Sequence, residues 1–150
     1  MKRILVAALL LLSVALTGCG GPATTPGTAP GEVQDVELVM LIRAAQPEIG
    51  SSFEAGQPVR VKDTGTLLGE ITDVRIEQSV SAIPDAQGEL HAAESPVLVD
   101  IWLTVRGQAT VSDAGYRFGS EYVYVNNDIR YLTPLAQFAG IITEMQVVGR

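Results

Sequence analysis

The chain has 150 residues, with 10 Lys or Arg against 17 Asp or Glu, so its formal net charge is −7. An acidic chain is repelled by nucleic acid and by anionic lipid, since both are bound through basic patches. We therefore expect no nucleic-acid partner. The single cysteine excludes a disulfide within the chain.

The N-terminal residues follow the order of a bacterial lipoprotein signal. Lys2 and Arg3 precede an apolar run at residues 4–16, which is too short for a membrane span of about 20 residues. The run ends in Leu16-Thr17-Gly18-Cys19. This tetrapeptide resembles the lipobox, whose cysteine is lipidated and becomes the first mature residue. We expect a signal peptide at residues 1–18 and a lipid anchor on Cys19, at the extracytoplasmic face of the cell membrane or outer membrane.

A linker and one domain follow the expected anchor. Residues 19–34 are rich in Gly, Pro and Thr and show no apolar periodicity, which is typical of a flexible tether. Residues 35–150 are long enough for a single domain with its own core.

Strand patterns dominate this domain. The clearest lies at residues 97–105, where Val97, Val99, Ile101, Leu103 and Val105 alternate with other residues and should share one face. One short helix is expected at residues 47–54, ended by Gly56. The expected strands, in chain order, are residues 36–43, 59–62, 67–77, 97–105, 116–118, 122–125, 129–133 and 138–148.

The domain also contains a weak internal repeat. Residues 69–76 and 140–147 both read Gly, any residue, Ile, Thr, acid, apolar, any residue, apolar, and residues 37–43 similarly echo 100–106. We interpret this as two similar halves, 36–77 and 99–148. They predict a mainly β fold, a small closed barrel with pseudo-twofold symmetry and at most one or two short helices. Gly69 and Gly140 should mark a sharp bend or a close backbone approach.

Three stretches carry short motifs: residues 59–74, the segments 85–88 and 100–107, and the ending at 132–143. These motifs resemble those of the domain of unknown function 4330 family. The resemblance implies a bacterial, β-rich protein that is attached to the membrane by its N-terminus and has no assigned activity. Many relatives have a transmembrane helix where this chain has a cleavable signal. Gln57 follows Gly56 where Gly-Asp would be typical, and the family offers no catalytic residue to transfer.

The sequence offers little support for catalysis. His91, the only histidine, falls in a polar stretch that we expect to be a loop, and one histidine with an acylated cysteine cannot make a zinc site. Asp73 and Asp100 could act as paired carboxylates only if their strands bring them together, and alternation puts Glu70 opposite Asp73 and Glu77. The segment at residues 85–89 is expected to be a polar turn, not a calcium loop. We therefore expect neither an enzyme, nor a cofactor, nor a metal.

Exposed aromatic residues are the remaining candidates for a site. Trp102, Tyr122 and Tyr124 could anchor a partner, since Trp and Tyr are enriched in binding hot spots. Trp102 would instead belong to the core if both faces of its strand are covered. The sequence thus favours a membrane-anchored binding or scaffolding module of the cell envelope, with an envelope protein or glycan as its partner. A carboxylate-based hydrolase of envelope glycans and a small-ligand carrier are the alternatives.

Overall fold

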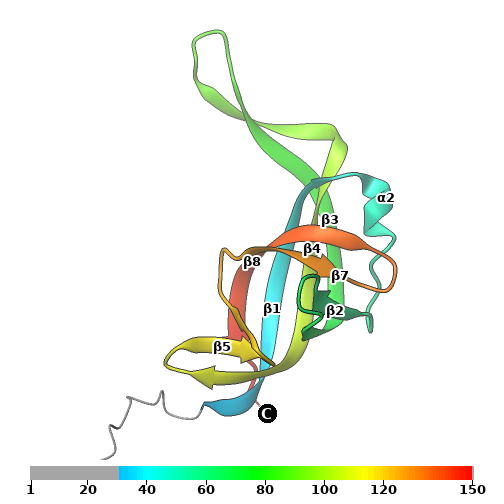
Figure 1. Ribbon diagram of the computed structural model, residues 1–150. Helices are drawn as coiled ribbons and strands as arrows, with labels where there is room; N and C mark the ends of the chain where they lie inside the picture. The colour runs from blue at the N-terminus through cyan, green and yellow to red at the C-terminus, as the bar shows by residue number, and fades with distance from the viewer. Residues whose placement is uncertain (1–30, 150) are drawn as a thin grey trace, which may run out of the picture.

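The structure is a computed structural model that describes residues 31–149 (Figure 1). Cys19, the signal peptide and most of the expected linker lie outside the described residues. The elements are β1 (Glu32–Ala45), α2 (Pro47–Gly50), β2 (Pro58–Val61), β3 (Leu67–Pro84), β4 (Leu90–Ser112), β5 (Gly115–Phe118), β6 (Glu121–Val123), β7 (Asp128–Leu132) and β8 (Gln137–Val147). The prediction of a mainly β fold with almost no helix is confirmed.

The helix is shorter than expected. It ends at Gly50 because Phe53, which is 5% exposed, turns into the core. There the Phe53 ring meets the edge of the Phe138 ring, with 5.1 Å between the ring centroids. Packing of this aromatic pair therefore overrides a sequence that could have continued the helix for another turn.

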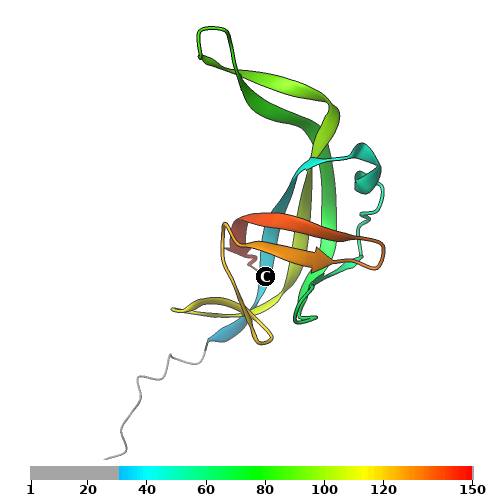
Figure 2. The same cartoon turned by 45° about the horizontal axis from the view of Figure 1, so that its top comes forward.

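All eight strands form one antiparallel sheet in the order β1-β8-β7-β2-β3-β4-β5-β6. β1 also pairs with β4, so six of the strands form a ring, while β5 and β6 extend from it (Figure 2). The ring surrounds one hydrophobic core to which all six strands contribute. Its fully buried large side chains include Leu38, Met40, Leu68, Ile71, Ile101, Leu103, Phe118, Tyr131 and Ile142.

Two β-bulges lie at the threonines of the repeated motif. The β3–β4 register shifts at Thr72, and the β1–β8 register shifts at Thr143. The Thr72 hydroxyl donates to the Thr104 carbonyl at 3.2 Å, and the Thr143 hydroxyl donates to the Val39 carbonyl at 3.1 Å. Val39 and Thr104 are themselves partners in the β1–β4 ladder. Each bulge is therefore held by a side-chain bond to the neighbouring strand.

The two repeated glycines differ in their surroundings. Gly69 has φ +153°, and a Cβ there would collide with the Arg106 carbonyl and lie 2.8 Å from the Gly107 Cα. The predicted close approach is thus confirmed at Gly69. A Cβ at Gly140 would make only ordinary contacts, the nearest at 3.5 Å, so no comparably close backbone approach occurs there.

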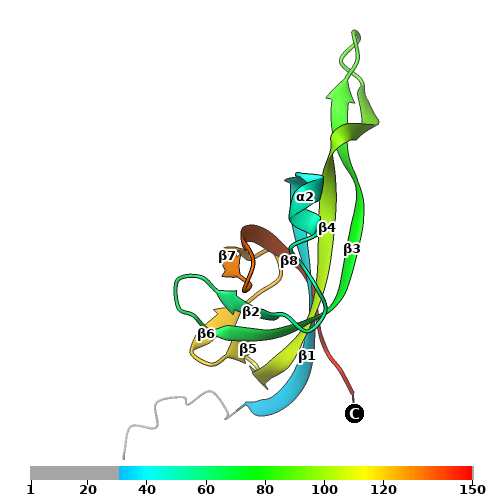
Figure 3. The same cartoon turned by 90° about the vertical axis from the view of Figure 1, so that its right-hand side faces the viewer.

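β3 and β4 continue beyond the ring as a projecting hairpin, which we call the arm (residues 79–98; Figures 1 and 3). The predicted strands ended at residue 77 and began at residue 97, so residues 79–96 of the arm are not part of the predicted fold. At its base the ladder is interrupted between Gln78 and Val80, and the Ser95 hydroxyl accepts bonds from the amides of Val97 and Leu98. Val97 is consequently 66% exposed instead of joining the predicted apolar stripe.

Candidate functional site

The carboxylates of β3 do not form the predicted arrangement. Because Thr72 is bulged, Glu70 pairs with Arg106 and Asp73 pairs with Thr104, two β4 positions that point the same way. The expectation that Glu70 lies opposite Asp73 is therefore wrong, since the extra residue reverses the alternation.

Asp73 and Asp100 also lie apart. Asp73 is opposite Thr104, and Asp100 lies four residues along β4 from Thr104. At ~3.3 Å per residue, the two backbone positions are about 13 Å apart along the strand. Carboxyl pairs that cleave glycosides are roughly 5–9.5 Å apart. Asp100 instead has a structural contact, because its Oδ1 accepts the Ala44 amide at 2.8 Å.

His91 lies on β4, opposite Ile83, and not in the expected loop. Its Nε2 is 3.0 Å from Asp85 Oδ2, while Asp85 Oδ1 accepts the amides of Gln87 and Glu89 at 2.8 and 2.9 Å. The bond to His91, followed by the bond from the Glu89 amide, lowers the pKa of Asp85 below its usual value. The predicted polar turn at residues 85–89 is confirmed, and these bonds order it.

Asp85, Glu89 and His91 are also the group of described residues whose geometry could hold a metal ion. Their potential ligand atoms all lie within 4.8 Å of one another at the tip of the arm. The Asp85–His91 contact explains the closeness of those two side chains, because a carboxylate and an imidazole form a hydrogen bond without a metal. Asp85 and His91 thus help to hold the turn that joins β3 to β4.

Trp102 lies on the outer face of the ring, partly covered. It pairs with Leu41 on β1 and with Arg75 on β3. The Arg75 guanidinium stands over the indole, 5.1 Å from its centroid, which is within the range of a cation–π contact. Its Nε1 is buried without a hydrogen-bond partner among the described residues. Trp102 is thus neither a freely exposed anchor nor a core residue.

Tyr122 and Tyr124 form an exposed aromatic pair. Their rings are nearly parallel, at 12°, with centroids 6.4 Å apart, and they are 40% and 51% exposed. The pair belongs to the β5–β6 extension, near the start of β1 and far from the arm (Figure 1). The structure therefore places two of the three predicted aromatic residues together and keeps Trp102 apart from them.

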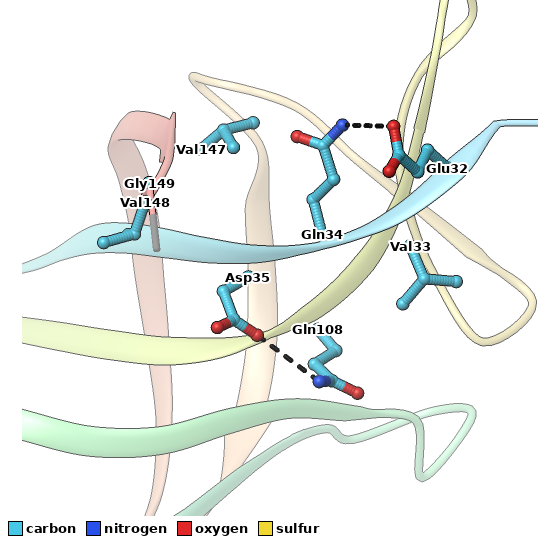
Figure 4. Close-up of a pocket in the computed structure, with 8 residues that line it drawn as sticks. All are labelled: Glu32, Val33, Gln34, Asp35, Gln108, Val147, Val148 and Gly149. Carbon is cyan, nitrogen blue, oxygen red and sulfur yellow. Dashed lines mark hydrogen bonds between the residues drawn. The ribbon is translucent and has the colours of Figure 1, made fainter.

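A pocket of about 290 Å³ lies where β1 begins and β8 ends (Figure 4). In its wall, Gln108 Nε2 donates a hydrogen bond to the Asp35 carboxylate at 3.3 Å. A second hydrogen bond runs from Gln34 Nε2 to the Glu32 carboxylate. The lining residues are half-buried or exposed. This pocket is a surface hollow, distinct from the ring interior that the core side chains occupy.

The arm is the surface that sequence reasoning missed. It exposes four large apolar side chains on one projection: Val80 at 50%, Ile83 at 53%, Leu90 at 69% and Val97 at 66%. In the sequence these residues are separated by polar ones, so neither a long apolar run nor a strong strand pattern marks them. In the sequence, the one indication of a strand there is the short alternation of polar and apolar residues around Val80 and Ala82.

The fold and these surfaces define a small antiparallel β domain with an ordered, apolar projecting arm. The model of the family Domain of unknown function (DUF4330) matches residues 4–146, so the chain belongs to this family. Neither the curated proteins nor the solved structures contain a match. Within residues 31–149, no helix is long and apolar enough to cross a membrane.

Proposed function

We propose that this protein is a lipid-anchored module of the bacterial cell envelope that binds a partner and catalyses no reaction. The observation that carries the proposal is the arm, which exposes Leu90 and its apolar neighbours far from the start of β1. Exposed apolar side chains gathered on one projection are typical of an interaction site. A module tethered by its N-terminus would present such an arm away from the membrane.

The anchor in this proposal is lipid on Cys19. The lipobox-like residues before it support this role, and two acyl chains hold a protein stably at a membrane. A linker of the expected length would span roughly 20 Å as a flexible coil. The proposed location is the extracytoplasmic face of the cell membrane or outer membrane.

The proposed platform is a small β-barrel with two pseudo-equivalent halves. Supporting it, Thr72 and Thr143 are both bulged and both donate to a carbonyl of the neighbouring strand, and their acceptors Thr104 and Val39 pair with each other. Exchanging β1 with β4, β2 with β7 and β3 with β8 also reproduces the strand neighbours of the ring. This exchange aligns Val39 with Thr104. The sequence repeat of residues 37–43 and 100–106 had aligned residue 39 with residue 102, so the two alignments differ by two residues.

Binding is favoured over the two alternatives for separate reasons. A hydrolase that used Asp73 and Asp100 would need them at working distance, but Asp73 pairs with Thr104, four residues along β4 from Asp100. A small-ligand carrier would need an interior cavity, whereas core side chains occupy the ring. An envelope protein or an envelope glycan remains the proposed class of partner.

The test is crosslinking and pull-down from intact native cells. Wild type should retain a specific crosslinked partner, and Leu90→Glu should lose it. Leu135→Glu is the matched control, because Leu135 is 66% exposed on the β7–β8 turn and lies outside the arm. The Trp102→Ala variant and a Tyr122→Ala/Tyr124→Ala double variant test the aromatic surfaces in the same assay. Hydrolysis of envelope glycans by the purified protein, abolished by Asp73→Asn or Asp100→Asn, would refute the proposal.

A further inference from the structure

The side chains of the arm sort into two unlike faces. In its ladder Val80 pairs with Glu94, Ala82 with Ala92, and Pro84 with Leu90. Paired residues, and residues two apart on a strand, point the same way. One face therefore carries Val80, Ala82, Pro84, Leu90 and Ala92, with Glu94 near its base. We call these five apolar residues the apolar face.

The opposite face is mostly polar. It carries Ser81, Ile83 and Asp85 from β3, and Glu89, His91 and Ala93 from β4. The contact between Asp85 and His91 lies on this side. A sheet with one apolar and one polar face normally buries the apolar one. In the part of the chain that the structure describes, no other element pairs with the arm.

Charge distinguishes the possible occupants of the apolar face. Residues 79–98 contain Asp85, Glu89 and Glu94 but neither Lys nor Arg. An anionic membrane surface would repel these carboxylates. A partner with Lys or Arg beside its contact surface would attract them and gain association rate and specificity.

A second copy of the chain is a poor occupant because the apolar face is small. Stable interfaces bury about 800 Å² per partner and use roughly 20–30 residues on each side. Two stacked arms would bring together only five apolar residues from each copy, three of them Ala or Pro. A groove that encloses the arm would contact the apolar face, both strand edges and the acidic tip together.

The tip is also ordered before binding. Asp85 accepts two backbone amides and contacts His91, and its own amide donates to the Glu89 carbonyl at 2.8 Å. Ordering in the free protein lowers the entropy lost on binding. We propose that the apolar face of the arm inserts into an apolar groove of a partner protein whose rim carries Lys or Arg. This inference rests on the proposed binding function and deepens it.

Adjacent alanines provide a matched test of the face. A photoreactive benzoylphenylalanine is placed in the full-length chain at Ala92, on the apolar face, or at Ala93, on the opposite face, and native cells are irradiated. The Ala92 probe should give one discrete protein adduct, and the Ala93 probe should give several-fold less. The crosslinked partner segment, identified by mass spectrometry, should be apolar and flanked by Lys or Arg.

Charge reversal tests the rim. In the Ala92 probe protein, Glu89→Lys with Glu94→Lys should lower the adduct yield roughly tenfold, and the matching Gln variants should lower it less. The inference is overturned by equal yields from both faces, by insensitivity to charge reversal, or by an adduct with a second copy or with lipid. Absence of any adduct overturns it as well. The proposed binding function would still stand if wild type retained a crosslinked partner in the pull-down and the Trp102→Ala or Tyr122→Ala/Tyr124→Ala variant lost it.

Discussion

Tyr131 provides a direct test of the core. Its side chain is fully buried on β7 and its ring contacts Phe138, but its hydroxyl has no hydrogen-bond partner among the described residues. A buried, unpaired hydroxyl costs about 1–3 kcal/mol. Tyr131→Phe removes that cost and keeps the ring. We therefore expect the variant to gain about 1 kcal/mol in the free energy of unfolding, or about 4 °C in Tm.

The same substitution should change the response to alkaline pH. Burial, with a smaller contribution from the charge of Asp128, raises the pKa of Tyr131 above its ordinary value of 10.0. The folded state therefore holds this proton more tightly than the unfolded state. Wild-type stability should be unaffected by this group below pH 10 and should fall as the pH rises above it. The Tyr131→Phe variant should lack this component of the loss.

The assay is urea unfolding followed by circular dichroism between pH 7 and 11, on the chain truncated before Gly20. Tyr122→Phe is the matched control, because that residue is 40% exposed and its hydroxyl can bond to water, so we expect a change near zero. A loss of about 1 kcal/mol or more in Tyr131→Phe at pH 7 would refute the reasoning, since the hydroxyl would then have a favourable partner.

Three further outcomes are expected. Gly107→Ala should cost about 3 kcal/mol or more in unfolding free energy, because its Cβ would collide with the backbone of β3. Gly88→Ala, which has φ +85° but open space, should cost only about 1–2 kcal/mol, and equal losses would contradict the clash. Thr72→Val and Thr143→Val should each cost about 1 kcal/mol, whereas a several-fold difference would count against equivalent halves. Cys19→Ala should shift the protein from the membrane fraction to the soluble fraction and abolish lipid labelling, and unchanged membrane association would refute lipid as the sole anchor.

The sequence was most informative where side chains alternate between core and solvent. The strand around Ile101 and Leu103 and the short strands near Val59 and Tyr131 were located because their inward positions are apolar. The bulge at Thr72 could not be located, since threonine suits either a regular or a bulged position. Because the extra residue in this bulge was not predicted, the predicted orientation of Glu70 relative to Asp73 was reversed.

The candidate site was harder to predict because exposure depends on contacts between distant segments. Trp102 is partly covered by Arg75, which lies 27 positions earlier in the chain, so its own strand pattern could not reveal the contact. His91 looked like a loop residue because the arm is surrounded by solvent and its strands lack a buried stripe. Only the pairing of His91 with Ile83 shows that a hairpin continues to the tip.

The central claim is that a partner covers the arm in the cell envelope. Thiol labelling tests it directly, because the native Cys19 is expected to be acylated and an introduced cysteine would be the sole reactive thiol. Leu90→Cys and Leu135→Cys place thiols at sites of similar exposure, 69% and 66%. The reagent is a membrane-impermeant maleimide that is supplied on the side of the membrane where the protein is anchored. We predict that it labels both variants when they are purified, but labels only Leu135→Cys in intact envelopes. Equal labelling of the two variants in intact envelopes would contradict the account.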